Sequence, residues 1–245
     1  MPDTSPIILL DSCSADRFSA SWRFGDHVRT LVAETPDQVV SVLEQAEAAT
    51  QQGLYAVGFV AYDAAQALNP HLPSRAAEPG LPPAWFALFQ ERQQVAAGID
   101  LPAGTPTGPD LSPTCSQADY ARAINRIHQA IEQGETYQIN YTFPLEGSWQ
   151  GDPLQLYRSL LEAQQPAFGA CLDIGSHTII SASPELFFSA RNGLITTRPM
   201  KGTAPRGRFP AEDLALADQL HQSDKERAEN LMIVDLLRND LGQVA

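Results

Sequence analysis

Lysine is rare in this chain, and its placement suggests amine chemistry. The sixteen basic residues comprise fourteen arginines and two lysines, Lys201 and Lys225. Arginine can replace lysine wherever only positive charge matters, but it cannot supply a primary amine that loses its proton and acts as a nucleophile. Most lysines are solvated surface residues, so the neighbours of Lys201 must decide between a surface lysine and a catalytic one.

Lys201 stands in a segment whose composition suits an anionic ligand. Gly202 and Thr203 follow it, and glycine allows the backbone to approach a ligand closely. Arg198 and Arg206 flank it with guanidinium groups that suit carboxylates. A free lysine amine is protonated at neutral pH, while burial and neighbouring cations favour the neutral form that a nucleophile requires. The sequence therefore predicts an anion-binding loop with an embedded amine.

A carboxylate, Glu185, is expected to reach this loop through a β-hairpin. Apolar-rich runs at 185–190 and 194–199 are joined by Asn192-Gly193, a strong signal for a two-residue hairpin turn. Such a hairpin would bring Glu185 and Lys201 to the same end of two paired strands, although they are far apart in the chain.

Two further carboxylates lie on a helix predicted over residues 223–242. Ser223 with Glu226 three residues later forms a capping box, and Gly242 is a typical stop signal. Glu226 and Glu229 share one face of this helix at i, i+3 spacing. Two carboxylates on one face can ligate a hard dication such as Mg²⁺, but acidic residues also stabilise a helix N-terminus without any ligand. Spacing alone leaves both interpretations open.

The remaining elements that must position these residues follow an α+β pattern. Periodicity predicts helices over 36–52 and 116–134 and a third that begins at Asp152-Pro153. Strands are expected in the apolar or alternating segments 7–10, 54–62, 84–89, 137–143, 168–174 and 177–182. Helices interspersed with several consecutive strands indicate an α+β fold built on antiparallel sheets.

Taken together, the motifs resemble those of the chorismate-utilising enzymes. The resemblance rests on Ser-Pro-Glu at 183–185, Arg-Pro-Met-Lys-Gly-Thr at 198–203 and Ser-Asp-Lys-Glu-Arg-Ala-Glu-Asn-Leu-Met at 223–232. Among these enzymes the motifs are most similar to those of aminodeoxychorismate synthase component I. The resemblance implies an α+β fold of the anthranilate synthase component I type. Family members are considerably longer, so it also implies that the C-terminal half is missing and that the chain alone is inactive.

The resemblance implies a role for each motif residue. Glu185 is implied as the general acid or base at the substrate ring, and Lys201 as the catalytic amine, at a position where anthranilate synthases usually carry alanine. Glu229 is implied as a Mg²⁺ ligand, with Glu226 beside it. The implied substrate-binding residues are Gln138, Arg198, Gly202 and Thr203. Relatives that add water to chorismate have a lysine where Gln138 stands, so glutamine is consistent with an aminating member.

The implied reaction joins chorismate and ammonia to give 4-amino-4-deoxychorismate, on the route to p-aminobenzoate and folate. A glutamine amidotransferase subunit would supply the ammonia, and Mg²⁺ would be the cofactor. Two alternatives remain. One is anthranilate synthase component I, against which Lys201 argues. The other is a non-catalytic remnant that only binds a partner or an effector.

The resemblance also suggests a domain division. Residues 1–92 resemble the amino-terminal domain of anthranilate synthase component I, and residues 116–245 the first part of the chorismate-binding domain. The segment 93–115, rich in Pro, Gly and Thr, is expected to be a linker. Residues 9–12, Leu-Leu-Asp-Ser, are similar to a Leu-Leu-Glu-Ser segment that helps to bind tryptophan in some relatives. A plain core strand is favoured here because the carboxylate is one carbon shorter.

Composition narrows the possible partners and compartment. With 245 residues and 43% hydrophobic content the chain can bury a substantial core. A net charge of −13 argues against nucleic acid and anionic membrane surfaces as partners. Basic residues are concentrated after residue 115, where an anionic substrate would be held. The three cysteines show no metal or disulfide spacing and no signal segment is apparent, so a cytoplasmic location is expected.

Overall fold

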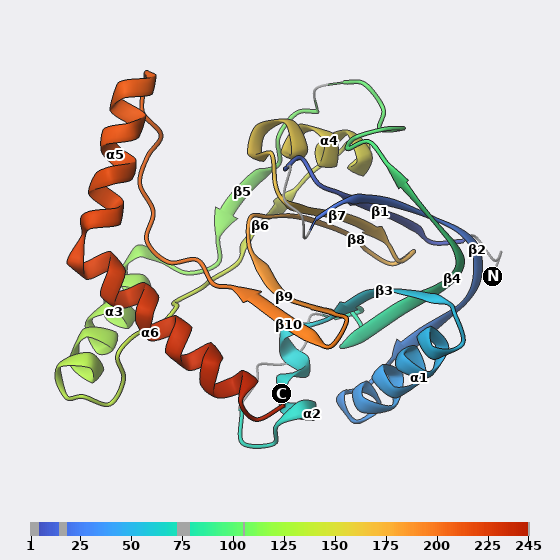
Figure 1. Cartoon of the computed structure of the whole chain (residues 1–245), viewed down its shortest axis with the longest axis horizontal. Coiled ribbons are helices and arrows are strands. Elements are labelled where there is room, and N and C mark those ends of the chain that lie inside the picture. The colour runs from blue at the N-terminus through green and yellow to red at the C-terminus, as the bar shows by residue number, and fades with distance from the viewer. Residues whose placement is uncertain (1–4, 15–18, 73–78, 105, 245) are drawn as a thin grey trace. The chain divides into compact units, whose positions relative to one another are not determined.

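The chain folds into antiparallel sheets and helices, in the α+β class predicted from the sequence (Figure 1). This computed structural model describes residues 5–14, 19–72, 79–104 and 106–244. The chain divides into two compact units, one formed by residues 1–100 together with 160–245 and the other by residues 101–159.

The larger unit is built on a six-stranded sheet in which every pair of neighbours is antiparallel. The strand order is β3-β4-β2-β1-β7-β8. The bounds are β1 (Ile7–Asp11), β2 (Ser21–Ala33), β3 (Tyr55–Val60), β4 (Ala84–Val95), β7 (Phe168–Asp173) and β8 (Thr178–Ser183). Five of these confirm predicted strands. Strand β2 was not predicted, because charged residues interrupt its apolar alternation and its pairing along β4 supplies the missing stabilisation.

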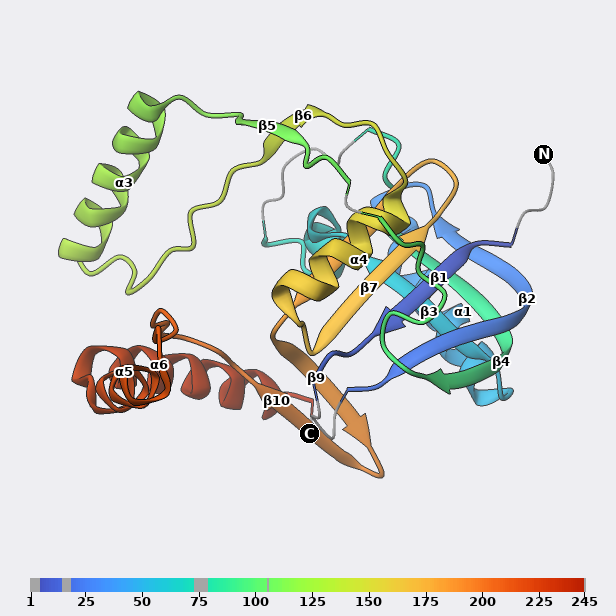
Figure 2. The same ribbon diagram turned by 90° about the horizontal axis from the view of Figure 1, so that it is seen from above.

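This sheet joins parts of the chain that the sequence assigned to different domains. Strand β1 pairs with β2 on one side and with β7 on the other (Figure 2). In this register Leu9 lies opposite both Arg23 and Cys171. The expected linker 93–115 contains the end of β4 and the strand β5 (Asp110–Pro113). The division into 1–92, 93–115 and 116–245 remains a prediction, but the six-stranded sheet includes strands from both sides of that linker.

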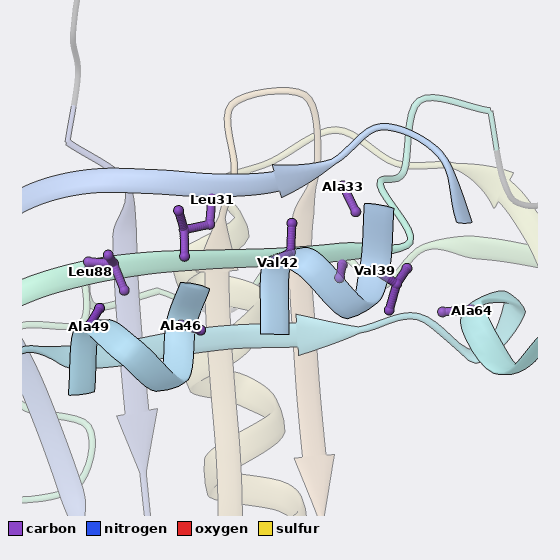
Figure 3. Close-up of a cluster of buried hydrophobic side chains, with 9 residues drawn as sticks. Leu31, Ala33, Val39, Val42, Ala46, Ala49, Ala64 and Leu88 are labelled. Atoms are coloured by element: carbon purple, nitrogen blue, oxygen red, sulfur yellow. The ribbon is translucent and has the colours of Figure 1, made fainter. Parts of the chain in front are cut away.

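Strand β4 runs through the core and is covered on both faces. Leu88 packs with Leu31 and with Val39 and Val42 of helix α1 (Val39–Gln51), as Figure 3 shows. On the opposite face Trp85 and Phe89 belong to a second cluster with Ile8 and Leu172. Successive strand residues point to opposite faces, so burial on both sides explains the continuous apolar run at 84–89.

Short helical turns follow the neighbouring strands: η1 (Pro36–Gln38), η2 (Tyr62–Ala64) and α2 (Ala65–Leu68).

The smaller unit contains helix α3 (Gln117–Glu132) and a two-stranded sheet of β5 and β6 (Leu145–Ser148). The helix predicted from residue 116 forms, and Ser116 caps it: the Ser116 hydroxyl accepts a hydrogen bond from the Asp119 amide at 3.1 Å. Helix α4 (Pro153–Gln164) begins in this unit and ends in the larger one.

The predicted strand at 137–143 is wrong. The segment has no regular structure, although its alternating pattern is typical of a strand. Two of its aromatic residues instead pack on α3, where the Tyr120 ring lies 5.7 Å from Tyr141 and 6.0 Å from Phe143 between centroids, while Tyr137 is exposed. A strand requires a hydrogen-bonding neighbour, and among the described residues none pairs with this segment.

Beyond the six-stranded sheet, the larger unit continues as a hairpin and two helices. These elements are β9 (Leu186–Arg191), β10 (Leu194–Arg198), α5 (Pro210–Gln222) and α6 (Asp224–Leu241). They carry most of the residues that the sequence marked for chemistry.

Candidate functional site

The predicted hairpin forms and has the predicted turn. Asn192 and Gly193 both adopt left-handed conformations, with φ values of 52° and 76°, as a type I′ turn requires. The register places Arg198 opposite Leu186, with a bulge between Thr196 and Arg198. The end of β10 therefore lies beside the start of β9, where Glu185 stands.

Glu185 is tied directly to the lysine-bearing loop. Its Oε1 atom accepts a hydrogen bond from the backbone amide of Met200 at 2.9 Å. Its own amide donates to the Ser183 hydroxyl at 3.3 Å. The carboxylate thus binds the residue next to Lys201, and the Glu185 side chain remains exposed. The hairpin therefore brings Glu185 to the lysine-bearing loop, as the sequence predicted.

Gly202 lets the same loop lie against helix α6. Its φ is +73°, a conformation that favours glycine. A Cβ atom at this position would stand 2.7 Å from Oε2 of Glu226 and 3.3 Å from its Cβ. The backbone of the loop at Gly202 therefore packs against the Glu226 side chain in the first turn of α6. Lys201 and Glu226 line the same pocket.

That pocket is open and has a volume of about 800 Å³. It is lined by Lys201, Ala217, Leu220, His221, Asp224, Glu226, Arg227, Ala228, Asn230 and Leu231. Its lining carries both signs of charge, with the cations Lys201 and Arg227 and the carboxylates Asp224 and Glu226 beside apolar residues. Such a mixed lining suits a small ligand that carries both carboxylate and hydroxyl groups.

The start of helix α6 presents the two predicted metal ligands. The Ser223 hydroxyl accepts from the Glu226 amide at 3.4 Å, which confirms the predicted cap. Glu226 and Glu229 are one turn apart in this helix, and Lys225 Nζ lies 3.8 Å from Glu226 Oε1. Within the described part of the chain, no cluster of three or more His, Cys, Asp or Glu side chains could hold a metal. Mg²⁺ usually takes one or two carboxylates and completes its shell with water and substrate oxygens, so that a magnesium site at Glu226 and Glu229 remains a prediction.

Arg206 does not provide the free guanidinium that the sequence suggested. Its Nε and Nη2 atoms donate to Asp213 at 2.7 and 2.6 Å, and the Gly207 amide also donates to Asp213 at 2.7 Å. Hydrogen bonding from Arg206, followed by that from Gly207, lowers the pKa of Asp213 to about 2. The Arg206 side chain therefore fastens the loop to the start of α5, and the anion-binding role expected for it is not supported.

The other predicted substrate-binding residues are distributed over both units. Arg198 and Thr203 are exposed on either side of Lys201. Gln138 belongs to the smaller unit, where its Nε2 donates to Asn140 Oδ1 at 3.3 Å and its Oε1 is buried without a hydrogen-bond partner in the described residues. The cluster of Glu185, Lys201, Gly202 and Glu226 is therefore the part of the predicted site that the structure brings together.

Sequence reasoning missed helix α5 and the pocket residue His221 near its end. The signals were present: Pro210 at the first helical position, and Glu212 and Asp213 in the first turn. Glu212 is further fixed by Arg208, whose Nη2 lies 2.9 Å from its Oε1.

No helix of the described residues has the length and apolar content needed to cross a membrane.

Aminodeoxychorismate synthases and anthranilate synthases are among the known proteins with similar sequences. The aminodeoxychorismate synthase component 1 of Salmonella typhimurium is 41% identical over 130 residues, which cover 53% of this chain and 29% of the relative. The anthranilate synthase component 1 of Pseudomonas putida is 33% identical over 148 residues, which cover 60% of this chain and 30% of the relative. The chain thus spans less than a third of the length of these curated relatives.

Solved structures agree on the fold. The anthranilate synthase component I from Streptococcus pneumoniae superposes with a TM-score of 0.75 at 21% identity, covering 95% of this chain and 63% of that chain. The fold is therefore of the anthranilate synthase component I type. The chorismate binding enzyme family matches residues 5–245, and the chain belongs to that family.

Proposed function

We propose that this chain contributes to an aminodeoxychorismate synthase component 1, an enzyme that aminates chorismate to 4-amino-4-deoxychorismate. The observation that carries the proposal is the placement of Lys201. The loop that bears it is held by the Glu185 carboxylate through Met200 and lies against Glu226 through Gly202. Lys201 and Glu226 therefore line one pocket, and Glu185 is hydrogen-bonded to the loop that carries Lys201.

In the proposed chemistry Lys201 acts as the nucleophile. Its Nζ forms a bond to the chorismate ring while the C–O bond of the 4-hydroxyl breaks, and the hydroxyl leaves as water with a proton from Glu185. Nζ passes its extra proton to Glu185, ammonia attacks at C4, and the bond between Nζ and the ring breaks as Nζ takes up the proton that the new amino group releases. The balance is chorismate plus ammonia giving 4-amino-4-deoxychorismate plus water.

Substrate carboxylates would be held near the same loop. Arg198 supplies a cationic fork at the end of β10, and Gly202 and Thr203 offer backbone and hydroxyl groups beside Lys201. Gln138 is proposed as a further hydrogen-bonding residue, because its side-chain oxygen is buried without a partner among the described residues. These roles rest on residue chemistry and on the resemblance of the motifs.

Glu226 and Glu229 would hold Mg²⁺ at the start of α6. The ion would supply Lewis-acid stabilisation of negative charge on substrate oxygens. Metal binding would require the Glu226 side chain to stay packed against Gly202, which holds its carboxylate near the loop that carries Lys201.

The ammonia would come from a glutamine amidotransferase subunit, as expected for a component 1 protein in the cytoplasm. Because the chain spans less than a third of its curated relatives, we expect no turnover from it alone and propose the reaction for a protein of the relatives' length that carries it. The similarity to an anthranilate synthase makes that activity the second candidate. Lys201 argues against it.

Product analysis after lysine substitution tests the proposal. In a protein of full length, Lys201→Arg and Lys201→Ala should both abolish the amine-dependent route to 4-amino-4-deoxychorismate, because arginine stays protonated. Lys225→Arg changes the other lysine, which is exposed, and serves as the matched control with activity retained. Anthranilate as the product of the unchanged protein would favour the second candidate. Full activity of Lys201→Arg would reduce Lys201 to a charged contact for a substrate carboxylate.

A further inference from the structure

Strand β4 is longer than its neighbour β3, and the difference leaves an open sheet edge. Pairing between the two strands ends where Tyr55 lies opposite Phe89. Pairing with β2 on the other side continues to Val95, which lies opposite Ser21. Figure 1 shows β4 continuing beside β2 beyond β3. Residues 90–95 thus have strand hydrogen bonds on one side, and on the β3 side no described strand pairs with them.

An arginine is fixed in the middle of this edge. The Arg92 guanidinium carbon lies 4.0 Å from the centroid of the Trp22 ring and 4.7 Å from that of Tyr55. Contacts of this kind hold a cation over the faces of aromatic rings. They restrict the side chain to one place, whereas charged residues that merely protect a sheet edge extend into solvent.

The donors of Arg92 remain available for a ligand. Stacking covers the faces of a guanidinium group, but its N–H groups point outward in the plane. Among the described residues, no carboxylate or carbonyl accepts a hydrogen bond from Arg92, whereas neighbouring Arg23 is paired with the buried Asp11 at 3.1 Å. The groove beside Arg92 measures about 460 Å³ and is lined by Arg23, Phe24, Gly25, Tyr55, Gln90, Glu91, Arg92 and Gln93.

We propose that residues 90–95 form a docking edge for an extended acidic segment of a partner protein. The segment would add as a strand beside β4 and place a carboxylate against Arg92. Strand addition supplies main-chain hydrogen bonds that are independent of sequence, and a pocket or charge beside the edge supplies the specificity. Trp, Tyr and Arg are also the residue types that dominate the energetics of protein interfaces.

An acidic partner fits this edge better than a second copy of the chain. A two-fold antiparallel pairing centred on Arg92 would set the two arginines directly opposite each other, which is destabilising. The chain also carries a net charge of −13, so two copies repel each other at long range. A carboxylate opposite Arg92 attracts the guanidinium instead of repelling it. A short segment also carries too little charge for long-range repulsion by the chain to prevent binding.

Peptide binding tests the docking edge on the chain itself. The probe is a capped peptide of alternating Thr and Val with one central Glu, compared with the same peptide carrying Gln. We expect the Glu peptide to bind about fivefold more tightly, because a charge-assisted hydrogen bond replaces a neutral one. It should also slow amide hydrogen exchange in 90–95 and not in 7–11, the paired strand β1. A version N-methylated along its pairing edge should not bind, because it lacks the donors for a ladder.

Charge reversal provides the matched variants. Arg92→Glu should reverse the preference, so that a peptide with central Lys binds better than the Glu peptide. Arg191→Glu, an equal charge change at the exposed end of β9, should leave the preference unchanged. Equal affinity for Glu and Gln peptides would remove Arg92 from the proposal. Absence of binding by every peptide would refute the docking edge, and a dimer that protects 90–95 without peptide would identify a second copy as the occupant. None of these outcomes depends on the chorismate chemistry.

Discussion

Replacing Gly202 by alanine tests whether the lysine loop is really packed on helix α6. The new methyl group would sit at a φ of +73° and 2.7 Å from Glu226 Oε2. Two effects are therefore combined: backbone strain at Gly202 itself and displacement of a neighbouring carboxylate.

The magnitudes of the two effects differ. A non-glycine residue in the left-handed region costs roughly 1–2 kcal/mol. The carboxylate of Glu226 can swing away from the new methyl group at little cost, because it is the far end of a flexible side chain. The Cβ atom of Glu226, 3.3 Å from the new methyl group, is fixed to the helix and must shift with the first turn of α6. Strain of about 1 kcal/mol corresponds to about a fivefold increase in the population of locally opened loop.

Hydrogen exchange measured by mass spectrometry reads this opening directly. For Gly202→Ala we expect about fivefold faster exchange in residues 200–203 together with a measurable change in the first turn of α6. Gly193→Ala is the matched control, since its φ is +76° but no heavy atom lies within 4 Å of the added Cβ. The control should affect the hairpin turn alone. Unchanged exchange in α6 for Gly202→Ala, or an equal effect of Gly193→Ala there, would refute the packing of the loop on the helix.

Other changes test the fold and the loop. Gly58→Ala should destabilise the chain by roughly 1–3 kcal/mol in urea unfolding, because its Cβ would stand 1.9 Å from the Trp85 carbonyl oxygen, and unchanged stability would contradict the β3–β4 register. Asp11→Asn should cost about 3 kcal/mol in the same assay because the Asp11–Arg23 pair is buried, whereas Arg122→Gln, which breaks an exposed pair, should leave the stability nearly unchanged. Asp213 should titrate near pH 2 by NMR: its lowered pKa means that the Arg206 contact stabilises the fold fully above the ordinary aspartate value and is lost as the pH falls through about 2, and an ordinary titration would show that this contact is absent.

Local signals in the sequence were sufficient for much of the site. Asn192-Gly193 specifies its own turn, because both residues tolerate positive φ. Ser223 caps α6 through the amide three residues later. These signals act within a few residues, so they predicted that Glu185 and Lys201 would meet without any knowledge of the rest of the chain.

Non-local pairing could not be predicted in the same way. Nothing in residues 7–11 indicates that they lie between β2 and β7, because a buried strand has no sequence signal for its neighbours. The segment 137–143 shows the converse case, in which alternation alone predicted a strand that has no partner in the described chain. Arg206 was expected to be free because Asp213, which binds both of its donors, belongs to a helix that was not predicted.

A covalent adduct is the most direct test of the account, whose central claim is that Lys201 supplies the reacting amine. A protein of full length that carries this chain would be incubated with chorismate and Mg²⁺ while ammonia is withheld, and its peptides would be analysed by mass spectrometry. The account predicts that the peptide containing Lys201 gains the mass of chorismate less one water, and that Lys201→Arg shows no such gain. An unmodified Lys201 together with a fully active Lys201→Arg variant would contradict it.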